Sequence, residues 1–289
     1  MFFAPGQLCG NFPVPRHTGT ITTVFKQDTQ LAMSRIICIA NQKGGVGKTT
    51  TAVNLAASLA ATERPTLLVD IDPQGNATSG VGVDKSRLKH TIYDALINEA
   101  DPQGLIVDTG HPFLHLMPSS ADLAGAELEL ATEVGREQKL KFILASLAEQ
   151  YRYVIVDCPP SLNLLTINAM TAADSVLIPL QCEYYAMEGL SQILNTIRLM
   201  QKGLNPFLKI EGILLTMFDA RGNLSKEVAE EIRTHFPGQV FETVVPRNVR
   251  LAEAPSHGRP VIYYDITSRG AASYLQLARE IIQRETANA

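Results

Sequence analysis

The feature that most constrains this chain is a glycine-rich run, which reads Lys43-Gly44-Gly45-Val46-Gly47-Lys48-Thr49-Thr50. An apolar run precedes it, and a helix-compatible run follows it as far as Ala61. Strand, glycine turn and helix form a cradle for a polyphosphate, because glycines let successive backbone N–H groups point at phosphate oxygens. The helix adds the positive end of its dipole. We therefore predict that these residues bind a nucleotide, with Lys48 on the β- and γ-phosphates and the Thr49 hydroxyl on Mg²⁺.

The same run departs from the general Walker A pattern in two ways. Gln42 stands where that pattern has glycine, and a second lysine, Lys43, lies five residues before Lys48. In this respect the run resembles the deviant Walker A loop of the ParA/MinD group of P-loop ATPases. The resemblance implies that the nucleotide is ATP, that both lysines act in its hydrolysis, and that Lys43 reaches across a dimer interface to the partner's nucleotide. The alternative is a glycine-rich turn with incidental lysines.

The rest of the chain alternates between strand-like and helix-like segments, which is typical of a parallel sheet with helices on both faces. Several strand segments are apolar throughout, as strands covered on both faces must be. We predict a doubly wound, mostly parallel α/β sheet of the P-loop NTPase class, with strands at 35–41, 66–71, 113–117, 153–157, 175–179, 210–216 and 243–245. Helices are predicted at 48–61, 91–98, 121–130, 136–149, 162–173, 186–202, 226–236 and 268–285.

The domain organisation follows from what lies between these segments. No internal repeat or linker divides the chain, so we expect one domain over residues 33–289. The first 32 residues are rich in Pro, Gly, Thr and Phe, and they lack the basic and apolar regions of a signal peptide. Because Met33 comes just before the first strand, residues 1–32 are interpreted as a disordered leader or a misassigned start.

Two aspartates end the second predicted strand. Asp70 and Asp72 are two residues apart, so alternation along a strand sends both side chains to one face, at the carboxyl edge where doubly wound sheets bind ligands. One carboxylate can hold a Mg²⁺-bound water, and the other can orient the attacking water. The Asp-x-Asp-Pro-Gln-Gly-Asn segment resembles that of the same ATPases, which implies that Asp72 is required for hydrolysis and that Asp70 supports the metal. A plain turn is the alternative.

A third aspartate ends a run of apolar residues that begins at Tyr153. This run, with Asp157 at its end, has the pattern of a Walker B strand, and its carboxylate is expected to bind Mg²⁺ through water opposite Thr49. Pro159 and Pro160 follow, and they are interpreted as a stiff segment that senses the γ-phosphate. Apolar strands that end in aspartate are common, so the interpretation depends on the glycine-rich run upstream.

Two loops after late strands have functions that the resemblance alone implies. The adenine is expected to contact Met217, Pro246, Arg247 and Asn248. A dimer-spanning surface for non-specific DNA is expected from Arg221, Arg247 and Arg250. Guanidinium groups suit phosphates, but ion pairs with local acids such as Glu253 and Asp265 are the alternative. Because 25 basic residues face 29 acidic ones, with a net charge of −4, any DNA site must be a local patch.

The cysteines and the last helix bear on other functions. The four cysteines have neither CxxC nor metal-ligand spacing, which favours reduced thiols in the cytoplasm and disfavours an iron–sulfur carrier. A MinD-like membrane tail would carry a basic polar face and apolar residues to its end, whereas this chain ends Glu-Thr-Ala-Asn-Ala. We therefore predict that the last helix packs on the core, and we keep a MinD-like membrane-associated positioning ATPase as the alternative function.

The motifs between Arg35 and Ile262, including Ala-Glu-Ala-Pro-Ser-His-Gly-Arg-Pro-Val, resemble the ParA/Soj branch of these ATPases. That resemblance implies an ATPase with weak intrinsic activity that dimerises on Mg·ATP and binds double-stranded DNA non-specifically. It also implies a ParB-type partner that stimulates hydrolysis, and a cytoplasmic, nucleoid-associated role in chromosome or plasmid partitioning. A related amide-forming ligase would need a substrate pocket that the sequence does not indicate.

Overall fold

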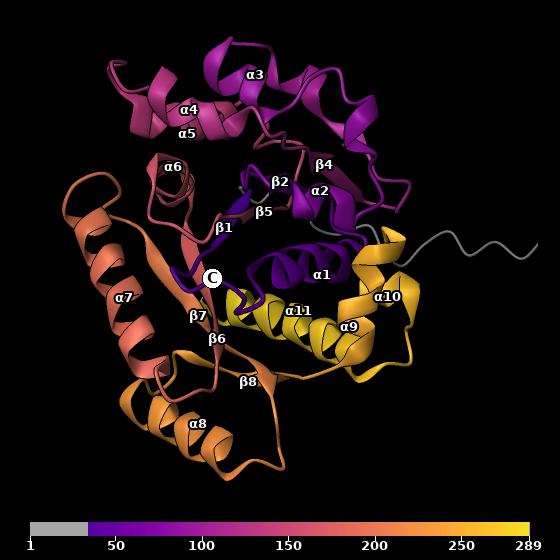
Figure 1. Cartoon of the computed structure of the whole chain (residues 1–289), viewed down its shortest axis with the longest axis vertical. Helices are drawn as coiled ribbons and strands as arrows, with labels where there is room; N and C mark the ends of the chain where they lie inside the picture. Colours follow the sequence, from indigo (N-terminus) through magenta and orange to yellow (C-terminus); the bar gives the residue numbers. More distant parts are fainter. Residues whose placement is uncertain (1–33, 289) are drawn as a thin grey trace, which may run out of the picture. The chain divides into compact units, whose positions relative to one another are not determined.

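The computed structural model describes residues 34–288, so the expected leader at 1–32 lies outside the described residues. Within them one sheet has the strand order β3-β4-β2-β5-β1-β6-β7-β8 (Figure 1). Neighbouring strands are parallel except β3 and β4. The strands are β1 (Arg35–Ile39), β2 (Thr66–Asp70), β3 (Val107–Asp108), β4 (Leu114–Met117), β5 (Tyr153–Asp157), β6 (Ser175–Gln181), β7 (Lys209–Phe218) and β8 (Val240–Pro246). The mostly parallel sheet is confirmed.

Helices connect these strands across both faces of the sheet. The α-helices are α1 (Lys48–Ala60), α2 (Asn76–Gly80), α3 (Ile92–Ile97), α4 (Leu123–Glu129), α5 (Lys139–Ala145), α6 (Leu164–Ala172), α7 (Ala186–Lys202), α8 (Asn223–His235), α9 (Val249–Glu253), α10 (Val261–Tyr264) and α11 (Arg269–Asn288). Short 3₁₀ helices are η1 (Lys85–Arg87), η2 (Pro102–Leu105), η3 (Arg136–Gln138) and η4 (Ala254–His257).

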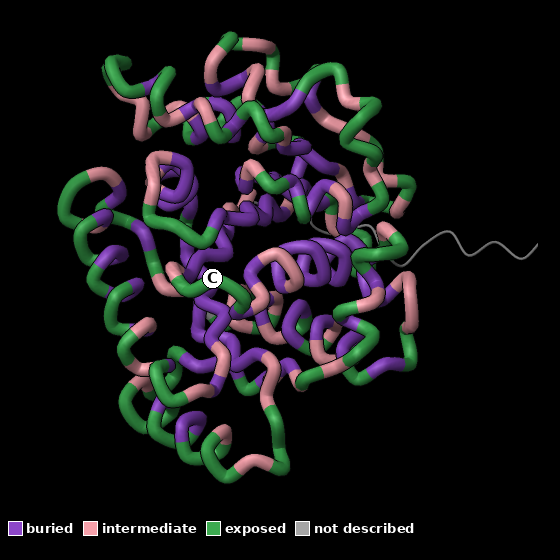
Figure 2. Tube along the Cα trace, viewed as in Figure 1, coloured by how far each residue is buried: buried purple, intermediate pink, exposed green. Residues whose placement is uncertain are grey.

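Alternation of side chains along the strands produces two apolar cores, one on each face of the sheet. In β1, Ile37 and Ile39 enter the core beneath α1, α10 and α11, while Cys38 enters the core beneath α3 to α8. The strands are therefore buried along most of their length (Figure 2). Two cores on one sheet are what a doubly wound fold requires.

The apolar stripe of α11 belongs to the first of these cores. Tyr274, Leu277, Ala278 and Ile281 are all buried, and α11 packs beside α1 (Figure 1). The predicted packing of the last helix on the core is thus confirmed. Among residues 34–288, no helix is long and apolar enough to span a bilayer.

The sequence predictions miss some short elements for local reasons. β3 has two residues and pairs antiparallel at the sheet edge, so it carries no apolar run. The helix predicted at 136–149 is divided into η3 and α5, and α5 ends early, where the Ser146 hydroxyl bonds the Ile143 carbonyl at 2.7 Å. α9 begins at a cap in which the Asn248 side chain accepts from the Arg250 N–H.

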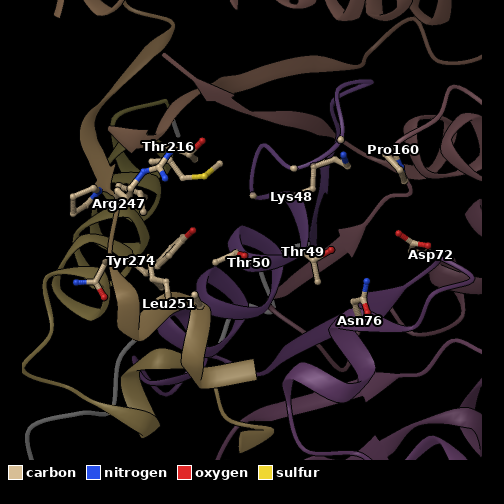
Figure 3. A pocket seen from close by; sticks show the side chains of 18 of the residues that line it. Lys48, Thr49, Thr50, Asp72, Asn76, Pro160, Thr216, Arg247, Leu251 and Tyr274 are labelled. Atoms are coloured by element: carbon tan, nitrogen blue, oxygen red, sulfur yellow. The ribbon is translucent and has the colours of Figure 1, made fainter. Parts of the chain in front are cut away.

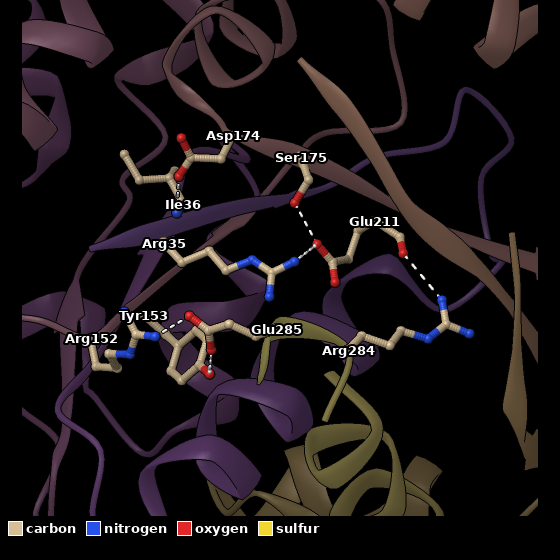
Figure 4. Close-up of polar contacts among 9 residues, drawn as sticks. All are labelled: Arg35, Ile36, Arg152, Tyr153, Asp174, Ser175, Glu211, Arg284 and Glu285. Carbon is tan, nitrogen blue, oxygen red and sulfur yellow. Dashed lines mark hydrogen bonds and ion pairs between the residues drawn. The ribbon is translucent and has the colours of Figure 1, made fainter. Parts of the chain in front are cut away.

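Polar contacts tie the amino edge of the sheet together (Figure 4). Arg35 at the start of β1 pairs with Glu211 of β7 at 2.5 Å, and the Ser175 hydroxyl donates to the same carboxylate at 2.7 Å. The Tyr153 hydroxyl, at the start of β5, donates to Glu285 of α11 at 2.6 Å. These contacts hold strands and helix in register at the edge opposite the site described next.

Candidate nucleotide-binding site

A cleft of about 550 Å³ opens at the carboxyl edge of the sheet. Its lining includes most of the residues predicted to hold the nucleotide, namely Gly44, Gly45, Gly47, Lys48, Thr49, Thr50, Met217, Pro246, Arg247 and Asn248. Lys48, Thr49 and Asp72 lie toward one end, and Arg247, Leu251 and Tyr274 toward the other (Figure 3). The end with Lys48 and Asp72 suits phosphates, and the other end, which is largely apolar apart from Arg247, suits a base.

The glycine-rich loop is held in shape by its neighbours. The side-chain oxygen of Asn41 accepts from the Lys43 N–H at 3.0 Å, and the Thr216 hydroxyl of β7 donates to the Val46 carbonyl at 2.8 Å. Gly47 precedes α1 with φ 89°, a conformation that favours glycine. Hydrogen bonds within the protein therefore fix the conformation of the loop, so its backbone is preorganised for a ligand.

Lys48, the first residue of α1, supplies a buried positive charge. Its ammonium donates to the Lys43 carbonyl at 3.0 Å, and the residue is only 7% exposed. Burial lowers the pKa of Lys48, while the negative charge of Asp157 opposes that shift. With the positive end of α1 beside it, this part of the cleft favours an anion.

Asp157, at the end of β5, is fully buried, and both of its carboxylate oxygens lack a hydrogen-bond partner among the described residues. Burial raises the pKa of Asp157 well above its ordinary value, and the charge of Asp70 acts in the same direction. Such an orphaned carboxylate fits a hydrated cation. Carboxylate oxygens are ligands that Mg²⁺ prefers, and such sites usually combine one or two carboxylates with the phosphates of the substrate.

Asp70 and Asp72 have different environments. The Asp70 carboxylate is buried and accepts from the Thr78 N–H and hydroxyl, both at 2.7 Å, and from the Asp72 N–H at 3.2 Å. Burial raises the pKa of Asp70 to about 6. Asp72 lines the cleft, and its Oδ1 accepts from the Gln74 N–H at 2.9 Å. In the structure Asp70 therefore holds the start of α2, and its role toward Mg²⁺ stays a prediction.

The apolar end of the cleft combines predicted and unpredicted residues. Met217 lines the cleft, and its φ of 47° is a strained value of the kind that collects at functional sites. Leu251 of α9 and Tyr274 of α11 also line it, and the Tyr274 hydroxyl lies 3.2 Å from the Thr51 hydroxyl. Tyr274 lies on the last helix, which the sequence predicted to pack on the core. No local signal marks it as part of a site, because only packing brings α11 to the cleft.

Known proteins are similar to this chain over most of its length. The family model of an AAA domain matches residues 34–210. Chromosome partitioning protein ParA of Myxococcus xanthus is 60% identical over 254 residues, which cover 88% of this chain and 90% of that protein. Sporulation initiation inhibitor protein Soj of Bacillus subtilis is 58% identical over 249 residues, which cover 86% and 98%. The chain belongs to the ParA/Soj family of chromosome-partitioning ATPases.

A solved structure supports the fold of this ParA/Soj family member. Cobyrinic acid a,c-diamide synthase from Mycobacterium smegmatis, with bound ADP and magnesium, has a TM-score of 0.78 and 37% identity. The match covers 89% of this chain and 97% of that chain. The P-loop NTPase fold predicted from the sequence is confirmed.

Two of the predicted nucleotide residues do not line the cleft of this family member. Val46 has a fully buried side chain, so it can offer a ligand only its backbone. Lys43 is exposed at the rim, where its ammonium pairs with Glu183 at 2.7 Å. The loop therefore directs one lysine, Lys48, inward and the other, Lys43, out of its own site.

The three arginines predicted to bind DNA are exposed on loops and a short helix at the carboxyl edge. Arg250 pairs with Glu253 at 2.7 Å and with Asp265 at 3.2 Å, so the local ion pairs considered from the sequence are present. The side chains of Arg221 and Arg247 form no ion pair with the described residues. The ParA/Soj surface at this edge therefore has two free guanidinium groups and one that is already paired.

Proposed function

We propose that the chain is an ATP-dependent dimerisation switch that binds DNA non-specifically and hydrolyses ATP in chromosome or plasmid partitioning. The observation that carries this proposal is the position of Lys43, exposed at the rim and outside its own cleft. The ion pair of Lys43 with Glu183 is exposed and therefore worth about 1 kcal/mol or less, so Lys43 can exchange it for a ligand outside its own cleft. A second copy of the chain facing this rim would receive that lysine at its nucleotide.

Mg·ATP suits the whole length of the cleft. The loop N–H groups and Lys48 would bind the phosphates, and Met217 with Pro246 would flank the adenine. The ADP and magnesium of the neighbouring synthase structure support the same pair here. Thr49 and the orphaned Asp157 carboxylate would hold the hydrated ion. Magnesium bound there supplies charge neutralisation for the phosphates.

Asp72 is the residue best suited to orient the attacking water. Its Oδ1 is held by the Gln74 N–H, and among the described residues no donor bonds its Oδ2. A carboxylate fixed through one oxygen can direct a water with the other. Lys48, together with Lys43 of the second copy, would neutralise the charge that develops on the γ-phosphate.

DNA binding in this proposal depends on two subunits, each of which contributes a small basic patch that binds DNA weakly by itself. In one subunit, Arg221 and Arg247 can bind DNA phosphates directly, whereas Arg250 must first leave its ion pairs with Glu253 and Asp265. The chain as a whole has a net charge of −4, which weakens binding to DNA. Two subunits joined by ATP would double the patch and make binding strong enough to last. A ParB-type partner would stimulate hydrolysis at the nucleoid and return the chain to a weakly binding cytoplasmic monomer. Slow intrinsic turnover would keep the ATP state long-lived.

The experiment that tests the switch is DNA binding with ATP, ADP and no nucleotide. We expect ATP-loaded protein to bind unrelated duplexes alike, and at least about tenfold more tightly than the ADP form does. The Lys43→Ala variant should bind ATP, remain monomeric in gel filtration and lose this gain. Lys202→Ala, which removes an exposed lysine at the end of α7, is the matched control.

Two results would contradict the proposal. Equal DNA affinity with ADP and ATP would refute the switch. A normal ATP-dependent dimer formed by Lys43→Ala would refute the shared site.

A further inference from the structure

We propose that Lys85 is a positioning residue for Asp72, which it orients by holding the peptide between Gln74 and Gly75. The inference rests on the proposed hydrolysis at Asp72 and names a second residue on which that step depends. Lys85 is the first residue of η1, and it lies outside both the cleft lining and the nucleotide motifs. Its role follows from its contacts.

The Gln74–Gly75 peptide is held at both of its polar atoms. The Lys85 ammonium donates to the Gln74 carbonyl at 2.8 Å. The N–H of the same peptide, on Gly75, donates to the Asp72 carbonyl at 2.8 Å. The Gln74 N–H, one peptide earlier, donates to the Asp72 Oδ1 at 2.9 Å. The held peptide shares the Gln74 Cα with the peptide whose N–H bonds the Asp72 carboxylate, so a displacement of Gln74 would move that donor.

The lysine side chain lies directly over this peptide. A Cβ added at Gly75 would stand 2.9 Å from the Lys85 Cδ, and Gly75 has φ 61°. Glycine thus permits both the turn and the close approach. From another direction the buried Ser119 hydroxyl donates to the Asp72 carbonyl at 2.6 Å. The loop that carries Asp72 is held between a buried hydroxyl and an exposed ammonium.

The backbone of Lys85 is itself anchored. The Asp84 carboxylate accepts from the Ser86 N–H at 3.0 Å and hydroxyl at 2.7 Å, and it pairs with Arg87 at 3.2 Å. The Val83 N–H donates to the Thr78 carbonyl of α2 at 3.3 Å. These contacts fix the start of the lysine side chain relative to α2. Because the Lys85 ammonium is charged, its hydrogen bond to the Gln74 carbonyl is stronger than one from a neutral donor.

The test compares steady-state ATP hydrolysis of the full chain with that of four variants. Lys85→Met removes the donor and keeps the apolar stem, and Lys85→Arg restores a donor. Lys89→Met removes the charge of a nearby exposed lysine whose side chain forms no hydrogen bond or ion pair with the described residues. Asp72→Ala serves as the benchmark for loss of the water-orienting group. Binding of a fluorescent ATP analogue and the Tm are measured for each.

We expect Lys85→Met to lower kcat about tenfold with KM changed by less than about twofold, because the carboxylate is misplaced while the phosphate contacts remain. Its analogue affinity and Tm should match those of the wild type. Lys85→Arg should recover most of the lost turnover. Lys89→Met should behave as the wild type, since it changes the charge without touching the loop.

Three outcomes would overturn the inference: wild-type turnover in Lys85→Met, an equal loss in Lys89→Met, or a loss carried by KM and Tm alone. The first two would show that the hydrogen bond from Lys85 to Gln74 does not determine kcat. The third would show that Lys85 affects only folding or nucleotide binding. Failure of the proposed function is distinguishable. If Asp72→Ala hydrolyses ATP normally, Asp72 is not the catalytic residue, whatever Lys85→Met does.

Discussion

Replacing Arg221 with alanine tests the proposed DNA surface through its dependence on salt. Arg221 follows β7 and is exposed, and its guanidinium forms no ion pair with residues 34–288. It is therefore free to neutralise a phosphate without first breaking a contact. Each neutralised phosphate releases condensed counterions, so the logarithm of affinity falls with the logarithm of salt by about 0.9 per contact.

The magnitude follows from the number of free arginines. In an ATP-loaded dimer, Arg221 and Arg247 of both subunits give about four phosphate contacts and a slope of about −3.6. Arg221→Ala leaves about two contacts and a slope of about −1.8. Between about 50 and about 200 mM salt, affinity should fall about 150-fold for the wild type and about 12-fold for the variant.

The wild-type slope also reports on Arg250. If this residue leaves Glu253 and Asp265 to bind DNA, about six contacts would steepen the slope to about −5.4. The change caused by Arg221→Ala, about 1.8, is the same in both cases. An exposed ion pair is worth about 1 kcal/mol or less, so this exchange is energetically accessible.

The assay is fluorescence anisotropy of a labelled duplex with ATP-loaded protein at several salt concentrations. Arg64→Ala is the matched control, because Arg64 lies between α1 and β2 at the amino edge of the sheet and carries the same charge. Equal slopes for Arg221→Ala and the wild type would refute the reasoning, as would an equal loss in Arg64→Ala.

Two further predictions concern the aspartates after β2. Asp72→Ala should abolish ATP turnover in a phosphate-release assay while a labelled analogue still binds, and turnover at the wild-type rate would show the assignment to be wrong. The pKa of Asp70 in the folded protein, about 6, lies above its ordinary value of 3.8, so the folded state takes up the proton first. The contribution of Asp70 to the free energy of unfolding should therefore fall by about 3 kcal/mol in total as pH rises from about 3 to about 7. For Asp70→Asn, the free energy of unfolding measured with urea should lack this fall with pH. If its pH dependence instead runs parallel to that of the wild type, the prediction is wrong.

The nucleotide loop and the sheet were accessible from local patterns. Consecutive glycines between an apolar strand and a helix can form few structures other than a phosphate cradle, and the loop residues from Gly44 to Thr50 line the cleft except Val46. Asp72 and Asp157 were predicted as site residues because parallel strands end at one edge of a sheet. In the structure Asp72 lines the cleft, and Asp157 is fully buried at the end of β5. Bounds of short elements were not accessible, since α2 and β3 are too short to show a period.

Tertiary structure alone decided how these parts are supported. Separate elements meet in the ion pair of Lys43 with Glu183, in the ion pair of Arg250 with Asp265, and in the hydrogen bond from Lys85 to Gln74. Packing of α11 likewise brings Tyr274 to the cleft. By itself the sequence predicted which groups are suited to bind phosphate, because those groups follow one another along a single loop of the chain. Which side chains orient them depended on packing, because a hydrogen bond of about 3 Å is met only after whole elements have docked.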